Sequence, residues 1–149
     1  MSKWQNRSDE GFTLVELMVV VLIIAILIAV AIPTFLGARR GAQDRAAQID
    51  LRNFLLAERT YYVDNTAYTT VVADLQTLDP SVNINADPAQ GTAITINADP
   101  TIVCGTRISE AANTFSVWES AAAGTYYGTT SLTGACPALP PAGFTTTTW

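Results

Sequence analysis

The residues at the start of this chain that could take part in chemistry surround one peptide bond. Gly11 and Phe12 join a polar leader, residues 1–11, to a long apolar run, and Glu16 follows about one helical turn after Phe12. Because Gly11 has no side chain, a peptidase at a membrane surface can close on the Gly11–Phe12 bond; a glycine ahead of a helix is also common in loops. Cleavage there would leave the apolar run on the mature chain, with a free amine at Phe12. An ordinary secretory signal is cut after its apolar core instead.

The side chains on which most enzymes depend are scarce. The chain has no histidine, and its single lysine, Lys3, lies in the leader. Histidine is the commonest general base and the commonest metal ligand, and no Gly-rich phosphate loop is present. The formal net charge of −5 also argues against binding of a nucleic-acid backbone, which needs a basic surface. We therefore expect neither an enzyme nor a cofactor, and no direct nucleic-acid binding.

Cys104 and Cys136 are the two cysteines of the chain. Two cysteines without any histidine cannot complete a four-ligand zinc site. In an exported domain the pair predicts a disulfide, which would stabilise the fold by about 3–4 kcal/mol on the chain-entropy model. Two unrelated buried thiols are the alternative.

These residues must be positioned by a long helix. The apolar tract from Phe12 to Ile32 is 21 residues, or about 31 Å as a helix, against about 30 Å for a hydrocarbon core. The helical pattern resumes after Pro33 and extends to about Val63 as an amphipathic helix, with one stripe of residues on the side expected to pack against another part of the protein. Its members are Ala47, Leu51, Leu55, Glu58 and Tyr62.

The remainder predicts a small antiparallel sheet. The pentapeptide INADP occurs at 84–88 and again at 96–100, which favours two short strands that each end at an Asp-Pro turn. Residues 92–97 are rich in β-branched side chains, and further strands are expected at 101–107, 114–119 and 125–130. Residues 65–91 look irregular, and the Pro- and Thr-rich end from Pro137 is expected to be extended or loose.

The order of these features, GFTLVE behind a short leader and ahead of an apolar helix that contains Pro33, resembles a type IV prepilin. The match is strong over residues 11–35 and architectural beyond. It implies that a membrane-embedded prepilin peptidase cuts after Gly11 and methylates the new amine of Phe12. It also implies an α+β, lollipop-like fold, in which the second half of the helix packs on a small antiparallel sheet and a C-terminal disulfide such as Cys104–Cys136 pins the last loop.

The resemblance also sets out the parts of the chain and its partners. The expected parts are the leader at 1–11, a transmembrane and filament-core helix at 12–35, its amphipathic continuation at 36–64, and a globular β-sheet head at 65–149. The precursor would cross the cytoplasmic membrane once and then join an extracellular pilus as a homo-oligomeric helical filament. The implied partners are the prepilin peptidase, an inner-membrane platform protein and assembly ATPases. A type II secretion pseudopilin, or a minor pilin or adhesin at the filament tip, is the alternative.

Glu16 and Pro33 have two interpretations each. Glu16 could serve the dipole of its own helix, or pair with the Phe12 ammonium of the preceding subunit and fix the axial register of a filament. Pro33 removes one helical hydrogen bond, and Gly37 and Gly41 follow it. The result could be a simple kink, or a segment that unwinds when the helix packs into a filament.

Two groups of charged residues remain open. Arg39 and Arg40 could contact lipid headgroups, or pair across the filament with acids such as Asp44 or Asp50. Some pseudopilins that the chain resembles bind calcium in the head, but no calcium-loop pattern is present here, and Asp-Pro is first of all a turn signal. The acids that could contribute to such a site are Asp74, Asp79, Asp87 and Asp99.

Overall fold

The computed structural model describes residues 11–147 and 149; leader residues 1–10 lie outside the described part. The chain divides into two compact units, one up to Ala38 and one from Arg39 to Trp149. Below, the N-terminal unit denotes residues 11–38 and the C-terminal unit denotes residues 39–149.

Helix α1 runs from Leu14 to Asn65. The expected long helix is therefore confirmed, with its ends displaced by two residues from those predicted. The helix continues without interruption through Pro33, Gly37 and Gly41. Every residue from 11 to 40 is exposed, whereas the second half of the helix buries one side. Its buried residues are Ala47, Leu51, Phe54, Leu55, Ala57 and Glu58.

Four strands form one antiparallel sheet in the C-terminal unit. They are β1 (Ala93–Ile96), β2 (Ile102–Ile108), β3 (Thr114–Ser120) and β4 (Gly124–Gly128), arranged in the order β1-β2-β3-β4. The pairing registers include Cys104 with Trp118 and Val117 with Tyr127. The α+β architecture and the antiparallel meander are confirmed, and each of these strands begins within one residue of its predicted start.

Two details of the region before β1 were wrong. The first INADP segment forms no strand: Ile84 makes only an isolated parallel bridge with Thr92, and Asn85 closes a local turn by accepting the Asp87 N–H at 3.0 Å. Residues 65–91 also contain a short helix, α2 (Val72–Leu78). Seven residues are too few to display a helical period, and the preceding Val71 makes no side-chain cap.

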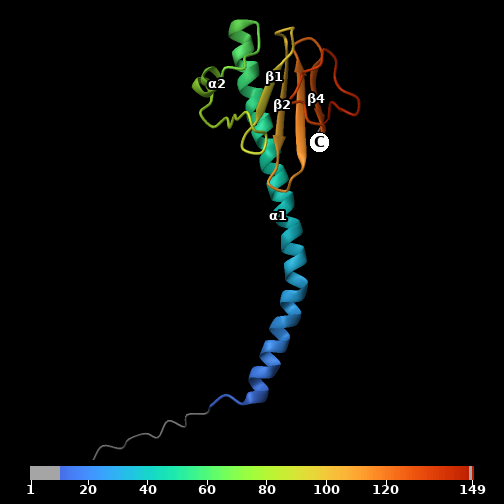
Figure 1. The fold of residues 1–149 in the computed structure, drawn as a ribbon. Helices are drawn as coiled ribbons and strands as arrows, with labels where there is room; N and C mark the ends of the chain where they lie inside the picture. The colour runs from blue at the N-terminus through green and yellow to red at the C-terminus, as the bar shows by residue number, and fades with distance from the viewer. Residues whose placement is uncertain (1–10, 148) are drawn as a thin grey trace, which may run out of the picture. The chain divides into compact units, whose positions relative to one another are not determined.

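One face of the sheet packs against the second half of α1 (Figure 1). Val103, Phe115 and Val117 on this face join Leu51 and Phe54 of the helix in a single core. The helix approaches the sheet closely at Gly105, where an added Cβ would come within 2.6 Å of the Phe54 ring. A larger residue at 105 would therefore force the Phe54 side chain to move.

The other face is covered by the segment that follows β4. Leu132 and Cys136 of this segment pack on Cys104 and Trp118, with a disulfide that joins Cys104 to Cys136 across a Cα–Cα distance of 5.6 Å. The Trp118 indole N–H donates to the Pro137 carbonyl at 2.8 Å. Because both faces are covered, the central strands β2 and β3 are buried along most of their length, without an alternation of buried and exposed residues.

The C-terminal end, which was expected to be extended or loose, is irregular but is held against the sheet. Thr145 exchanges two backbone hydrogen bonds with Tyr127, at 2.7 and 2.9 Å, so the tail closes part of the β4 edge. The indole N–H of Trp149 is shared between the Ser116 carbonyl at 3.1 Å and the Gly128 carbonyl at 2.8 Å. The Trp149 ring packs edge-on against Tyr127 and Phe115. Trp149 and Thr145 thus fix to the sheet a segment that its composition predicts to be extended or loose.

Candidate functional site

The Gly11–Phe12 bond lies in an open segment ahead of α1. Residues 11–13 are outside the helix, and all three are exposed. A Cβ added at Gly11 would meet nothing within 4 Å, and the Phe12 side chain is 76% exposed. A second protein could therefore reach this bond without unfolding any part of α1.

Thr13 caps the helix that follows. Its hydroxyl oxygen accepts the Glu16 backbone N–H at 3.2 Å, and its carbonyl accepts the Leu17 N–H at 3.3 Å. Glu16 stands at the third helical position, so Thr13 and Glu16 have the spacing of a capping box. The sequence interpretation missed this role of Thr13, although the T-x-x-E spacing was the available signal. An acid in the first turn also interacts favourably with the helix dipole.

The N-terminal unit exposes an unbroken apolar run from Leu17 to Ile32. In the most apolar 18-residue window of α1 the mean hydropathy is 3.3, which makes the helix long and apolar enough to cross a membrane. Thr34, beside Pro33, donates its hydroxyl to the Val30 carbonyl at 3.2 Å. That bond satisfies the hydroxyl within the helix, so an apolar environment around Thr34 would leave no unpaired donor there.

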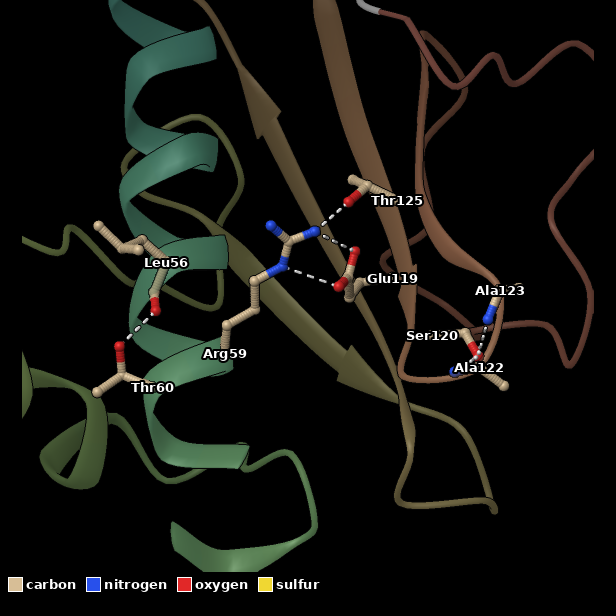
Figure 2. Close-up of polar contacts among 8 residues, drawn as sticks. All are labelled: Leu56, Arg59, Thr60, Glu119, Ser120, Ala122, Ala123 and Thr125. Carbon is tan, nitrogen blue, oxygen red and sulfur yellow. Dashed lines mark hydrogen bonds and ion pairs between the residues drawn. The ribbon is translucent and has the colours of Figure 1, made fainter. Parts of the chain in front are cut away.

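In the C-terminal unit, ion pairs attach α1 to the sheet. Figure 2 shows Arg59 reaching from α1 to Glu119 of β3, with Nε to Oε1 at 2.9 Å and Nη2 to Oε2 at 3.2 Å; the same Nη2 also donates to the Thr125 hydroxyl. The hydrogen bond to Glu119 raises the pKa of the Arg59 guanidinium. Since the Glu119 side chain is only 5% exposed, this two-point contact replaces the water that the carboxylate loses.

Two further acids of α1 interact with side chains of the C-terminal unit. Asp50 accepts Arg107 Nε at 3.0 Å, and Asp44 accepts the Ser109 hydroxyl at 2.6 Å. Both are therefore engaged within the C-terminal unit, which weakens the idea that they pair with Arg39 or Arg40 of another subunit.

Glu58 is a fully buried acid on the face of α1 that packs on the core. Its Oε2 accepts the Thr69 backbone N–H at 3.1 Å, whereas Oε1 has no partner among the described residues. Burial raises the pKa of Glu58 to about 8, against the lowering effect of the Thr69 N–H. The residue was assigned to the packing stripe from sequence, but a buried, protonated carboxyl was not foreseen. The carboxyl ties α1 to the loop that precedes α2.

The aspartates considered for calcium are used mainly in turns. Asp79 accepts the Ser81 N–H and hydroxyl, and Asp99 accepts the Thr101 N–H and hydroxyl; these bonds lower the pKa of both carboxyls. Among the described residues, no three acidic, cysteine or histidine side chains come together as metal ligands would.

Comparison with known proteins gives a consistent set of similarities. The family described as "Prokaryotic N-terminal methylation motif" matches residues 6–32. The type IV wide pilus major component PilA4 of Thermus thermophilus is 33% identical over 98 residues, which is 66% of this chain and 72% of that protein.

Two further relatives match over shorter shares of their length. The type II secretion system core protein G of Pseudomonas aeruginosa is 34% identical over 84 residues, 56% of this chain and 59% of that protein. The type IV major pilin protein PilA of Myxococcus xanthus is 36% identical over 64 residues, 43% of this chain and 29% of that protein. None of these names denotes an enzyme.

Proposed function

This chain belongs to the type IV pilin family, and we propose that it is the structural subunit of a type IV pilus, which polymerises into a cell-surface filament. One observation carries the proposal. The C-terminal unit covers both faces of its sheet, yet the N-terminal unit leaves every residue from 11 to 38 exposed. Such a surface needs an apolar environment, which a membrane supplies before assembly and the helices of other copies supply afterwards.

The processing step is proposed at Gly11 and Phe12. The exposed bond between them, the match of residues 6–32 to the methylation motif and the start of α1 at Leu14 support cleavage after Gly11 and methylation of the Phe12 amine. The leader at 1–11 would be removed, which leaves the helix at 12–35, its continuation at 36–64 and the head at 65–149.

Glu16 is proposed to set the register of assembly. Its carboxylate lies in the exposed first turn of α1, within reach of a partner chain. In an apolar filament core, pairing with the Phe12 ammonium of the preceding subunit would satisfy both charges, and any other stagger would bury them unpaired. Pro33 is proposed to mark the segment of α1 that unwinds in the filament.

Assembly needs further proteins. Because lipid tails are as apolar as leucine, the hydrophobic effect does not pull α1 out of the membrane. We therefore propose an inner-membrane platform protein and cytoplasmic ATPases as partners, and the outer cell surface as the final location. No catalytic role, cofactor or metal is part of the proposal.

A pseudopilin of a type II secretion system is the second candidate, because the core protein G of Pseudomonas aeruginosa is 34% identical over 84 residues. The broader match to a pilus major component, 72% of that protein against 59%, favours the pilus.

The deciding experiment is intact mass and N-terminal sequencing of material sheared from the cell surface. An abundant chain that begins at methylated Phe12 is the expected result. A chain that begins at Phe12 in membranes and is missing from sheared fibres would favour the pseudopilin, and a chain that still begins at Met1 beside an active peptidase would overturn the processing step. Gly11→Leu should block cleavage, with Gly41→Ala as the control that leaves the site intact.

A further inference from the structure

A cleft of about 340 Å³ opens in the C-terminal unit beside the first turns of α1 that belong to that unit. Helix α1 lines one side, and the end of β2 with the two residues that follow it lines the other. The helix side is formed largely by small residues, which leave the space open; these are Ala42, Ala46 and Ala47. The charged side chains at the cleft are Arg39, Arg107 and Glu110. A small ligand with both signs of charge could therefore be recognised here.

The two arginines of the cleft have unused hydrogen-bond donors. Arg107 is held in place by Asp50, which accepts Nε at 3.0 Å, and by the Pro88 carbonyl, which accepts Nη1 at 3.1 Å. Its Nη2 makes no hydrogen bond with any residue that the structure describes. Arg39 is exposed and has no ion-pair partner in the described part of the chain. Guanidinium donors that are free of protein partners suit the oxygens of a phosphate.

A carboxylate lines the same cleft. Glu110 Oε2 accepts the side-chain amide of Gln43 at 2.8 Å, whereas Oε1 has no partner among residues 11–147 and 149. A plain anion at the arginines would be repelled by this carboxylate. A ligand that carries an ammonium a few atoms from its phosphate would instead satisfy both signs of charge. The side chains thus favour a zwitterion of the phosphoethanolamine type over inorganic phosphate.

The chain brings this cleft close to the end of a segment that is apolar enough to cross a membrane. Leu36 is the last large apolar residue before Arg39, and it is 48% exposed. Three residues span at most about 11 Å even when fully extended. The headgroup region is about 5–8 Å thick on each side of the hydrocarbon core. With Leu36 at the edge of the hydrocarbon, the long side chain of Arg39 reaches the headgroups.

We propose that the cleft binds the phosphoethanolamine headgroup of a membrane lipid, with Arg39 and Arg107 on the phosphate and Glu110 on the ammonium. The inference rests on the proposed function, since it assumes that the chain resides in a membrane before assembly. It goes beyond that function by adding a lipid-recognition site to the C-terminal unit. The chain would have to release this lipid when it enters a filament.

Lipid titration of the full chain tests the proposal. The chain in dodecyl maltoside micelles is titrated with dihexanoyl phosphatidylethanolamine, phosphatidylcholine or phosphatidylglycerol, and bound lipid is counted by native mass spectrometry. We expect phosphatidylethanolamine to bind about tenfold more tightly than the other two. The choline ammonium has no N–H to donate to Glu110, and the glycerol headgroup has no ammonium at all. Equal binding of the three lipids would overturn the inference.

A neighbouring arginine provides the matched control. Arg39→Gln should weaken phosphatidylethanolamine binding by about tenfold, because it removes one charge-assisted contact to the phosphate. Arg40→Gln makes the same change of charge at an exposed residue that does not line the cleft, and it should bind like the parent chain. An equal loss in both variants would mean that net charge alone attracts the lipid, and would overturn the inference.

Glu110→Gln tests the ammonium contact. This variant should lose the preference for phosphatidylethanolamine over phosphatidylglycerol, because the arginines remain while the partner of the ammonium is gone. A preference that survives in Glu110→Gln would contradict the proposal. The Cys104–Cys136 disulfide should form in each variant, which checks that the C-terminal unit is folded.

Competition separates a lipid from a free phosphate as the source of the ligand. Inorganic phosphate, added at the same concentration as the lipid, should not displace phosphatidylethanolamine; displacement would show a plain anion site and would overturn the inference. None of these measurements needs a filament. A failure of lipid binding is therefore distinct from a failure of the pilus proposal, which is read from the N-terminal sequence of sheared material.

Discussion

The buried carboxyl of Glu58 should make the C-terminal unit less stable as the pH rises. Its pKa is raised from 4.5 to about 8 by burial, so the folded state holds the proton more tightly than the unfolded state does. The stabilisation from this proton is complete below pH 4.5, falls as the pH rises from there, and is lost once the pH passes about 8.

The size of the effect follows from the same two values. At about 1.4 kcal/mol for each pKa unit, the difference between 4.5 and about 8 corresponds to about 5 kcal/mol above pH 8. At pH 7 the corresponding loss relative to pH 4.5 is about 3 kcal/mol, because Glu58 is still mostly protonated there in the folded chain and ionised in the unfolded chain.

Glu58→Gln isolates this contribution, since glutamine keeps the shape of the side chain and carries no titratable proton. Its stability relative to the parent chain should increase by about 3 kcal/mol between pH 4.5 and pH 7. Glu58→Met, which lacks the polar group as well, should show the same change with pH from a different starting value. The free energy of unfolding is measured by urea titration of the full chain in detergent, followed by tryptophan fluorescence, to which the buried Trp118 contributes.

The comparison between pH values matters more than either absolute stability. A new amide at position 58 changes the packing by an amount that is the same at each pH, so it cancels in the difference. If both variants lose stability with pH in parallel with the parent chain, Glu58 does not hold a proton in the folded state. The reasoning from its burial and its single Thr69 bond would then be refuted.

Three further predictions concern the ties that hold the C-terminal unit together. Arg59→Met should lower the free energy of unfolding by about 1–3 kcal/mol, because it leaves the buried Glu119 carboxylate without its charged partner. Urea titration checks this. The double variant Arg59→Met, Glu119→Met should lose less stability than the sum of the losses in the two single variants. Trp149→Phe should cost about 1 kcal/mol through its lost hydrogen bonds, and Trp149→Ala roughly 2–4 kcal/mol, as read by thermal unfolding. Cys104→Ser with Cys136→Ser should cost about 2–5 kcal/mol, and dithiothreitol treatment of the parent chain should reproduce the same shift in the urea midpoint.

The parts of the fold that could be predicted from sequence are those with a long or repeated local pattern. Helix α1 extends over 52 residues, and its apolar and amphipathic periods identify it without tertiary information. The four strands are visible because β-branched and aromatic residues recur between turns. Helix α2 escaped prediction because its seven residues bury only Leu75, which gives no period to detect.

The C-terminal segment shows that composition alone can be a misleading guide to structure. Threonine and proline cannot form a core by themselves, and residues 137–149 were therefore predicted to be extended or loose. Trp149 reverses this, because its ring fills a place beside Phe115 and Tyr127, and its N–H reaches two carbonyls of β3 and β4. Such a place exists only once the sheet has formed, so no local pattern could reveal it.

The residues of the candidate site likewise fall into those that a local sequence pattern identifies and those that only the fold brings together. Gly11, Phe12 and Glu16 could be named from sequence because they lie within one linear stretch, and the Thr13 cap was readable there as well. The Arg59–Glu119 pair could not be named, because its members are 60 residues apart and meet only through the packing of α1 on β3. Likewise, the buried state of Glu58 depends on the loop that supplies the Thr69 N–H.

The distribution of exposed apolar surface over the two units bears on how the chain assembles. In the C-terminal unit the charged groups nearest the sheet are paired, the sheet is covered on both faces, and the tail closes part of one edge, so little remains there to drive association. Most of the exposed large apolar side chains instead lie on α1, above all in the N-terminal unit. We propose that such a subunit leaves the membrane only in exchange for contact with other copies. In the proposed filament, contact with other copies would replace lipid as the apolar environment of this surface.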